Sequence, residues 1–322
     1  MSLTLGELKK ILETAPDDTD ISQYFPVQEI EKRIVPEMVT DIPIEGAVAQ
    51  VKHSCNPGDI MASLVACKKY YEITGRKVKY MQKINYVAGY YPGAVHPTVD
   101  ETGTNVTLNR RMFNLIKPLV ESQEYIDSFE EYDGQRVDIN FDGIRGETFV
   151  NLPHGSIQAW LFYAFPELEA DISKPWVFLK STKQQIEEVT KGKILVNFTE
   201  RYRNTQIPLE YHFLRKYSPD LIFAGTETEH FKFCTKWGID MPLLKTNDFL
   251  EDAYAIRGAR FLLCNQSWMW NCATALGTPR LLEVCNFAQN CMPFYGDDNR
   301  GYFHQVALEH YFRMMYNNTM YK

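Results

Sequence analysis

The second half of the chain alternates short apolar runs with segments of helical spacing. The apolar runs KILVNFT, DLIFAG, RFLLCN and RLLEV are typical of buried parallel strands. Between them lie TEHFKFCTKWG, NDFLEDAYAIRGA and SWMWNCATALG, which have apolar residues at helical spacing and a glycine near the end. Strands that alternate with helices in this way favour an open parallel sheet with right-handed crossovers. The sequence therefore predicts an α/β fold.

The first half repeats this alternation and predicts a second α/β unit. AVAQVKHS, KVKYMQ and QRVDINFDG are strand candidates, and helices are expected over 58–73 and over NRRMFNLIKPLVES. GSIQAWLFYAFPELEADISKP then has helical spacing followed by a polar stretch with prolines, which places a domain boundary between 166 and 176. The predicted divisions are a helical preamble at 1–45, Rossmann-like domains at 46–170 and 171–295, and a final helical segment at 296–322.

Two Rossmann-like domains of this size are expected to face each other across a cleft, with ligands at the carboxyl ends of the strands. A chain of 322 residues is long for one core, which agrees with two domains. The tail GYFHQVALEHYFRMMY predicts a last helix. Its face of Phe303, Ala307, Tyr311 and Met314 is expected to pack against the N-terminal domain.

Charge and cysteine content narrow the class of protein. The formal net charge is −7, which makes nucleic acid or an anionic membrane a poor partner. The seven cysteines are irregularly spaced and include no C-x-x-C, so we expect reduced, buried thiols in a cytoplasmic protein. No apolar run approaches the ~18 residues of a membrane span, and no secretion signal precedes the first strand.

Several familiar cofactor and metal patterns are absent from the sequence. It contains neither G-x-G-x-x-G nor G-x-x-x-x-G-K-[ST], which argues against a nicotinamide oxidoreductase and a P-loop kinase. The histidines and cysteines do not have zinc-ligand spacing. Asp18-Thr19-Asp20 matches a D-x-D metal motif in form, but no apolar strand leads into it. We therefore predict no metal site and no cofactor.

The turn Asn56-Pro57-Gly58-Asp59 joins the first strand to its helix and has two interpretations. In the structural one, Pro57 and Gly58 allow a tight turn, and Asp59 caps the first N–H groups at the positive end of the helix dipole. In the functional one, Asp59 faces the cleft and takes part in chemistry. The turn by itself does not decide between them.

Three later loops should also lie at the carboxyl ends of strands, namely NFTERYRN, Gly225-Thr226-Glu227 and Asn265-Gln266-Ser267-Trp268. Arg201 and Arg203 follow one strand, and the planar fork of an arginine suits a diphosphate. The alternative is that these arginines are surface residues or pair with Glu200 or Glu210. Ser267 opens a helix and offers free N–H groups to an anion, or is a plain N-cap. Trp268 could stack on a base or belong to the core.

The ordered set of these motifs resembles the lipopolysaccharide heptosyltransferase family, which is glycosyltransferase family 9-like. NPGDIMASLVACKKYY looks like its first βα turn, of the form G-D-x-x-x-(T/S)-x-P-A-(L/I). FLEDAYAIRGARFLLCNQSWMWNCATALGTPRLLE resembles its stretch containing N-D-S-G-P-M-H-L-A-A-A-L-G-T-P, and IFAGTETEHF resembles its glycine-containing loop. The similarity runs from about residue 46 to 285.

The resemblance implies a GT-B fold and sugar transfer from a nucleotide-activated donor to a hydroxyl, usually without metal. It implies that Asp59 is the general base, with Asn56 and Gly58 on the acceptor side. The donor and its phosphates are then expected at a second set of residues, namely Arg201, Arg203, Thr226, Glu227, Thr246, Asn265, Ser267 and Trp268. The alternatives are a nucleotide-sugar epimerase or hydrolase on this scaffold, and a non-catalytic nucleotide- or sugar-binding protein.

The donor motif departs from the family pattern at three positions. Gln266 stands in place of the acid, Trp268 in place of the small glycine, and Asn271 in place of the usual histidine. These replacements predict a donor pocket of different shape and charge, and loss of activity is one outcome that they allow.

Overall fold

The computed structural model describes residues 48–89, 98–146, 155–180, 185–288, 290–293 and 298–317. The described residues belong to one compact unit. The predicted preamble at 1–45, with Asp18-Thr19-Asp20, lies outside the described residues.

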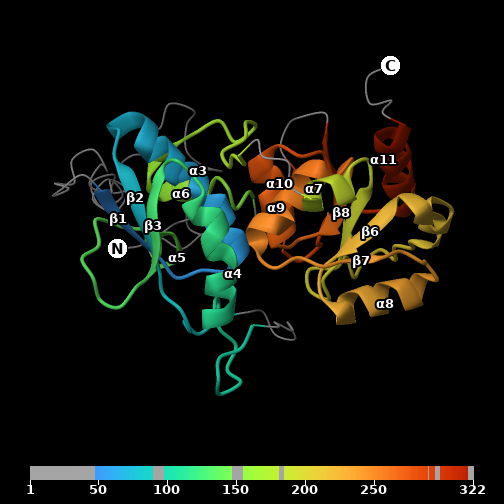
Figure 1. The fold of residues 1–322 in the computed structure, drawn as a ribbon, viewed down its shortest axis with the longest axis horizontal. Helices are drawn as coiled ribbons and strands as arrows, with labels where there is room; N and C mark the ends of the chain where they lie inside the picture. Colours follow the sequence, from blue (N-terminus) through green and yellow to red (C-terminus); the bar gives the residue numbers. More distant parts are fainter. Residues whose placement is uncertain are drawn as a thin grey trace, which may run out of the picture. The chain divides into compact units, whose positions relative to one another are not determined.

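The N-terminal sheet has four parallel strands in the order β3-β2-β1-β4. These are β1 (Val48–His53), β2 (Lys77–Gln82), β3 (Ile126–Glu131) and β4 (Ile139–Asn140). Figure 1 labels the first three of these strands along the chain. Helix α3 (Pro57–Thr74) follows β1, and helix α4 (Arg110–Glu121) precedes β3. The sequence did not predict edge strand β3, because only Ile126 and Phe129 of its residues are buried. The predicted strand at 135–143 is reduced to β4.

The C-terminal sheet has six parallel strands in the order β10-β9-β8-β5-β6-β7. These are β5 (Ile194–Asn197), β6 (Leu221–Ala224), β7 (Leu243–Leu244), β8 (Phe261–Asn265), β9 (Arg280–Glu283) and β10 (Asn299–Tyr302). Counted from β5 along the chain, this is the 3-2-1-4-5-6 order of the doubly wound fold. The order reverses between β5 and β8, so a ligand crevice is expected at the carboxyl ends of these two strands.

The helices of this sheet are α8 (Glu227–Trp237), α9 (Phe249–Gly258) and α10 (Trp268–Leu276), with a 3-10 helix at His212–Asp220. The predicted α/β fold is confirmed by the two parallel sheets. β5, β6, β8 and β9 are buried along their whole length, which agrees with the run of apolar residues in each.

The segment between the sheets consists of short helices. These are α5 (Gly143–Gly146), α6 (Trp160–Ala164), a 3-10 turn at Pro166–Leu168 and α7 (Gln185–Thr190). The Trp176 indole donates to the carbonyl oxygen of Met61 in α3 at 2.9 Å, and its backbone N–H donates to Ala275 in α10. This segment therefore contacts both halves of the unit, and the domain boundary at 170 stays a prediction.

Helix α3 is buried on most of its circumference, whereas the sequence predicted one apolar face. Its residues Asp59 to Cys67 are all buried, because α3 packs on the N-terminal sheet and also against α10. Contact between the two helices is close at Gly58, where an added Cβ would lie 2.9 Å from Nδ2 of Asn271. Glycine at this position lets the first turns of α3 and α10 meet.

The last helix, α11 (Gln305–Asn317), packs on the C-terminal sheet (Figure 1). Its buried residues Leu308, Phe312 and Met315 belong to the core that includes Phe261 and Tyr302. The prediction that this helix packs against the N-terminal domain is therefore wrong for the described residues. The buried face is also shifted by one residue, since Ala307 and Tyr311 are only partly buried. The large apolar side chains of α11 cover the open face of their own sheet.

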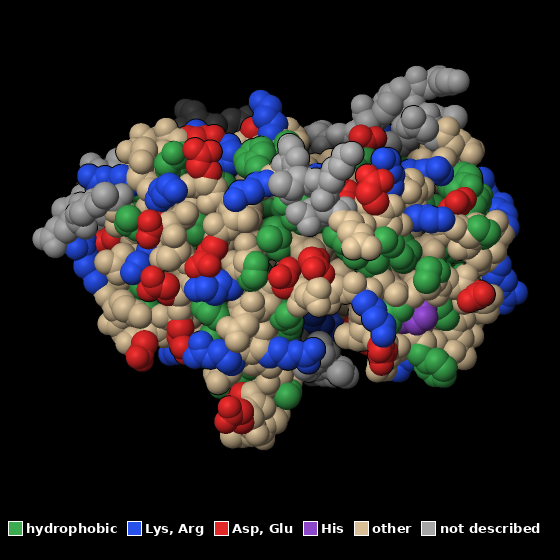
Figure 2. All heavy atoms as spheres, viewed as in Figure 1, with side chains coloured by type: hydrophobic (Ala, Val, Ile, Leu, Met, Phe, Trp, Pro, Cys, Tyr) green, Lys and Arg blue, Asp and Glu red, His purple; other side chains and the backbone are tan. Residues whose placement is uncertain are grey.

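All seven cysteines are free thiols, and six of them are buried, as predicted. No helix in the described part of the chain has the length and apolar character needed to cross a membrane. On the face drawn in Figure 2, Lys and Arg side chains are interspersed with Asp and Glu side chains.

Candidate functional site

A pocket of about 740 Å³ lies at the carboxyl ends of strands from both sheets. Its N-terminal wall contains the first turn of α3 and the first turn of α4. Its C-terminal wall contains the loops after β5, β6 and β7 and the start of α10. Of the predicted site residues, those that line it are Asn56, Gly58, Asp59, Arg201, Thr226, Thr246, Ser267 and Trp268.

Hydrogen bonds between side chains connect the ends of β5 and β8, where the strand order reverses. The Ser267 hydroxyl donates to Oδ1 of Asn197 at 2.7 Å, and Nδ2 of Asn197 donates to the carbonyl of Ala224. Oδ1 of Asn265 accepts from the backbone N–H of Thr199 at 2.9 Å. Asn265 is fully buried and does not line the pocket. It positions the loop after β5 and is not placed to touch a ligand, which differs from its predicted role.

Asp59 combines the two interpretations that the sequence left open. Its Oδ2 accepts a hydrogen bond from the backbone N–H of Asn56 at 3.2 Å, which caps α3. The same side chain is 8% exposed and lines the pocket. Asp59 is therefore a helix-capping residue that also lines the pocket.

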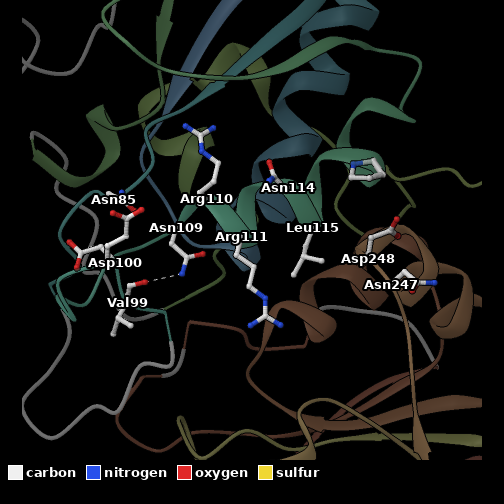
Figure 3. A pocket seen from close by; sticks show the side chains of 12 residues that line it. Asn85, Val99, Asp100, Asn109, Arg110, Arg111, Asn114, Leu115, Asn247 and Asp248 are labelled. Atoms are coloured by element: carbon white, nitrogen blue, oxygen red, sulfur yellow. Dashed lines mark hydrogen bonds between the residues drawn. The ribbon is translucent and has the colours of Figure 1, made fainter.

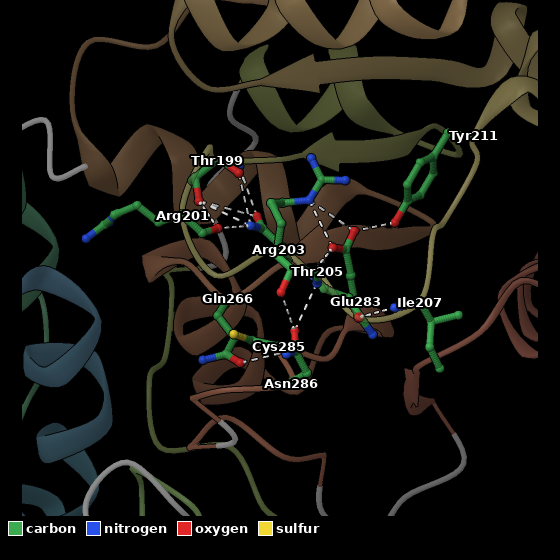
Figure 4. Close-up of polar contacts among 12 residues, drawn as sticks. Thr199, Arg201, Arg203, Thr205, Ile207, Tyr211, Gln266, Glu283, Cys285 and Asn286 are labelled. Carbon is green, nitrogen blue, oxygen red and sulfur yellow. Dashed lines mark hydrogen bonds and ion pairs between the residues drawn. The ribbon is translucent and has the colours of Figure 1, made fainter. Parts of the chain in front are cut away.

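The two predicted phosphate-binding arginines point in different directions (Figure 4). Arg201 lines the pocket, and its Nε is buried without a hydrogen-bond partner among the described residues. Arg203 does not line the pocket, and its Nε donates to both carboxylate oxygens of Glu283 at 3.0 and 3.1 Å. Figure 4 shows the Arg201 side chain extending away from the Glu283 carboxylate.

The partner of Arg203 explains why this arginine lies outside the pocket. Glu283 has 1% of its side chain exposed and also accepts from the Asn204 backbone at 2.7 Å and from the Tyr211 hydroxyl. Burial opposes the charge of Arg203, but the Glu283 carboxylate raises its pKa above the ordinary value. The guanidinium neutralises a buried carboxylate at the end of β9, and Arg203 lies outside the pocket. The sequence alternative had named Glu200 and Glu210 as partners.

Thr226 and Glu227 behave differently at the start of α8. Thr226 is the N-cap, and its hydroxyl accepts from the backbone N–H of Glu229, whose carboxylate accepts from the Thr226 N–H. Thr226 and Glu229 line the pocket. Glu227 does not: its side chain is 83% exposed and lies 4.0 Å from Lys245. Of the two predicted site residues in this loop, Thr226 and Glu227, only Thr226 lines the pocket.

Trp268 forms part of an aromatic wall. Its ring stacks on that of Phe249 in α9, with centroids 4.0 Å apart and planes inclined by 8°. Phe249 is buried, and both residues line the pocket. A tryptophan at the start of α10 thus fills space that a glycine would leave open.

The other two divergent motif residues form amide hydrogen bonds. Oδ1 of Asn271 accepts from Nε2 of Gln158 at 2.7 Å, and Nε2 of Gln266 donates to Oδ1 of Asn290 at 2.8 Å. Asn271, Gln266 and Asn290 line the pocket. These neutral amide contacts stand where the family pattern that the sequence resembles has a charged group and an imidazole.

The sequence reasoning missed Asp252 and Arg111. Asp252 lies in the first turn of α9, is 8% exposed and lines the pocket. Burial raises the pKa of its carboxyl to about 7. Arg111 is an exposed residue of α4 and lines the opposite wall. In the sequence, Asp252 is simply an aspartate within a segment of helical spacing. Aspartates in such segments are usually exposed to solvent, so the pattern offers no reason to select this one.

A second hollow of about 740 Å³ adjoins the first turn of α4 (Figure 3). The side chains of Arg110 and Arg111 point in opposite directions there. Arg110 pairs with Glu131, whereas Arg111 lines both hollows. In the part of the chain that the structure describes, no group of three His, Cys, Asp or Glu residues is arranged to hold a metal ion.

No family model matches the chain, and no curated protein matches it in sequence. Solved structures do match it. Escherichia coli heptosyltransferase WaaC with ADP has a TM-score of 0.51 at 9% identity, covering 83% of this chain and 99% of that one. The ADP-heptose LPS heptosyltransferase II of E. coli has a TM-score of 0.46 at 9% identity, covering 85% and 99%. A glycosyl transferase family 9 protein from Veillonella parvula has a TM-score of 0.46 at 10% identity, covering 86% and 90%. The likeness to WaaC shows that this chain has the fold of that heptosyltransferase.

Proposed function

We propose that the chain transfers a sugar from a nucleotide-activated donor to a hydroxyl group of an acceptor. One observation carries this proposal: a single pocket has Asp59 on its N-terminal wall and Arg201 with Ser267 on its C-terminal wall. A carboxylate on one side and anion-binding groups on the other are what transfer to a hydroxyl requires. The shared fold with a heptosyltransferase solved with ADP supports the assignment.

The diphosphate of the donor binds at the start of α10 in this proposal. The first N–H groups of a helix lack partners within it and carry partial positive charge. The first turn of α10 and the Arg201 side chain both line the pocket, so they offer donors to the same anion. Together they offset the charge of the leaving diphosphate, and the transfer we propose needs no metal held by the protein.

Asp59 is the general base in this proposal. It accepts the proton of the acceptor hydroxyl as that oxygen attacks the sugar carbon, while the nucleoside diphosphate leaves. Such a base contributes about 10² to 10⁴ in rate. Asn56 and Gly58, which line the pocket beside Asp59, border the acceptor.

The free thiols support the proposed cytoplasmic location, because that compartment keeps cysteines reduced.

The test is release of nucleoside diphosphate from a panel of nucleotide sugars, measured with and without a mixture of glycan acceptors. Release that depends on the acceptor is expected. Release without acceptor would indicate a hydrolase, and a changed sugar without release would indicate an epimerase. Binding without either change would indicate a binding protein.

A further inference from the structure

The buried carboxyl of Asp252 is not used by the proposed transfer. Its Oδ1 accepts from the Thr246 hydroxyl at 2.7 Å, and no cation pairs with it among the described residues. Three groups interact with it electrostatically. They are the carboxylates of Asp248, the N-cap of α9, and of Glu251 in the same helix, and the Cys272 thiol in α10. None of these is positive. A carboxyl that is desolvated without a cation or further donors destabilises the fold.

The position of Asp252 indicates which chemical group of a ligand could form a hydrogen bond with its carboxyl. Asp252 follows Phe249 by three residues in α9, so the two side chains lie on the same face of the helix. Phe249 is stacked on Trp268, and all three residues line the pocket. The site thus places a hydrogen-bond acceptor close to an aromatic wall. A flat ring with N–H groups on its edge has this combination of surfaces.

We infer that Asp252 is a specificity-determining residue that accepts a hydrogen bond from the exocyclic amino group of the donor's nucleobase. This inference rests on the proposed function, since it assumes that a nucleotide occupies the pocket. A carboxylate accepts hydrogen bonds and donates none, so it favours an amino group over a carbonyl oxygen at the same place on the base. Thr246 positions the carboxyl through its hydroxyl.

The experiment compares nucleotides that differ at one amino group. Binding of ADP against IDP, GDP against IDP and CDP against UDP is measured by calorimetry at pH 8, where the carboxyl is ionised. In at least one pair, wild-type protein should bind the amino nucleotide about tenfold to a hundredfold more tightly, as expected for a hydrogen bond to a charged group. Asp252→Asn presents an amide that can donate as well as accept, so this variant should lose the preference.

Glu251→Gln is the matched control, because it changes a carboxylate to an amide in the same helical turn outside the pocket. It should keep the wild-type preference. Equal binding within every pair by the wild-type protein would overturn the inference, and so would a preference that persists in Asp252→Asn. Should Asp252→Asn not fold, Asp252→Ser and the wild-type comparison decide the same question. Failure of the wild-type protein to bind any of the nucleotides would instead overturn the proposed function, and the inference with it.

Discussion

The Nε atom of Arg203 lies 3.0 Å from Oε1 of Glu283, and this ion pair joins the loop after β5 to the end of β9. Removing one partner of a buried pair leaves an uncompensated charge. We therefore expect Arg203→Ala to lower the free energy of unfolding by about 3 kcal/mol, near the lower end of the usual range because Arg203 keeps some exposure. Urea denaturation measures this, with Arg313→Ala in an exposed helical pair as the control. An effect equal to that of Arg313→Ala would contradict the assigned role.

Arg201→Ala should lower the affinity for a diphosphate and leave the stability of the fold nearly unchanged. The side chain forms no ion pair among the described residues, so stability should change by no more than about 0.5 kcal/mol. The affinity for a nucleoside diphosphate should fall about tenfold to a hundredfold, because a charge-assisted contact is lost. Calorimetry with the diphosphate and with its parent nucleoside checks this. A similar loss of affinity for the nucleoside would place Arg201 elsewhere than at the phosphates.

Asp59→Asn should keep donor binding and lose most of the transfer. The amide oxygen still accepts from the Asn56 N–H, so the helix cap is largely retained. An amide is not a base, so the rate should fall by about 10² to 10⁴. The measurement is turnover at saturating donor together with diphosphate affinity. Wild-type turnover in the variant would leave Asp59 a helix cap and nothing more.

The ionisation of Asp252 should make stability depend on pH. Its carboxyl has a pKa raised to about 7 in the fold from an ordinary value of 3.8, so the native state holds the proton over a range in which the unfolded chain has released it. Stability should therefore fall as the pH rises from about 4 to 7, by about 1.4 kcal/mol for each unit of pKa difference. Melting temperatures of wild type and Asp252→Asn between pH 5 and 8 test this. The difference between the two proteins should change with pH. Glu251→Gln should keep most of the wild-type dependence, shifted to lower pH because one of the carboxylates that raise the pKa of Asp252 is lost.

Gly58→Ala should disturb the contact between α3 and α10. The added methyl would meet Nδ2 of Asn271 at 2.9 Å, and the Asn271 amide is held by Gln158. Crowding of this kind costs about 1–3 kcal/mol in a packed core. In an Asn271→Ala background the same substitution should cost much less. A double-mutant cycle of unfolding free energies measures the coupling, and additive costs would show that the two residues do not press on each other.

The sequence by itself determined the α/β class and most of the elements. Runs such as Ile194–Asn197 and Phe261–Asn265 are apolar up to a final asparagine, because both faces of a parallel strand are covered. The helix predicted at 58–73 is observed at Pro57–Thr74, because a capping turn and a glycine mark its ends locally. The turn residues Asn56, Gly58 and Asp59 could be found in the same way, since strand ends converge at one edge of a sheet.

Only the tertiary structure decided which side chains share the pocket. Arg201 and Arg203 are equivalent in the sequence, and the buried Glu283, 80 residues from Arg203, separates their roles. The packing of α11 on its own sheet, instead of on the N-terminal domain, depends on which apolar surface is open to it. The raised pKa of Asp252 comes from desolvation by its surroundings. Local periodicity predicts which apolar residues are buried, but it does not determine which distant residues pair or how far a single polar side chain is desolvated, because both depend on the packed molecule.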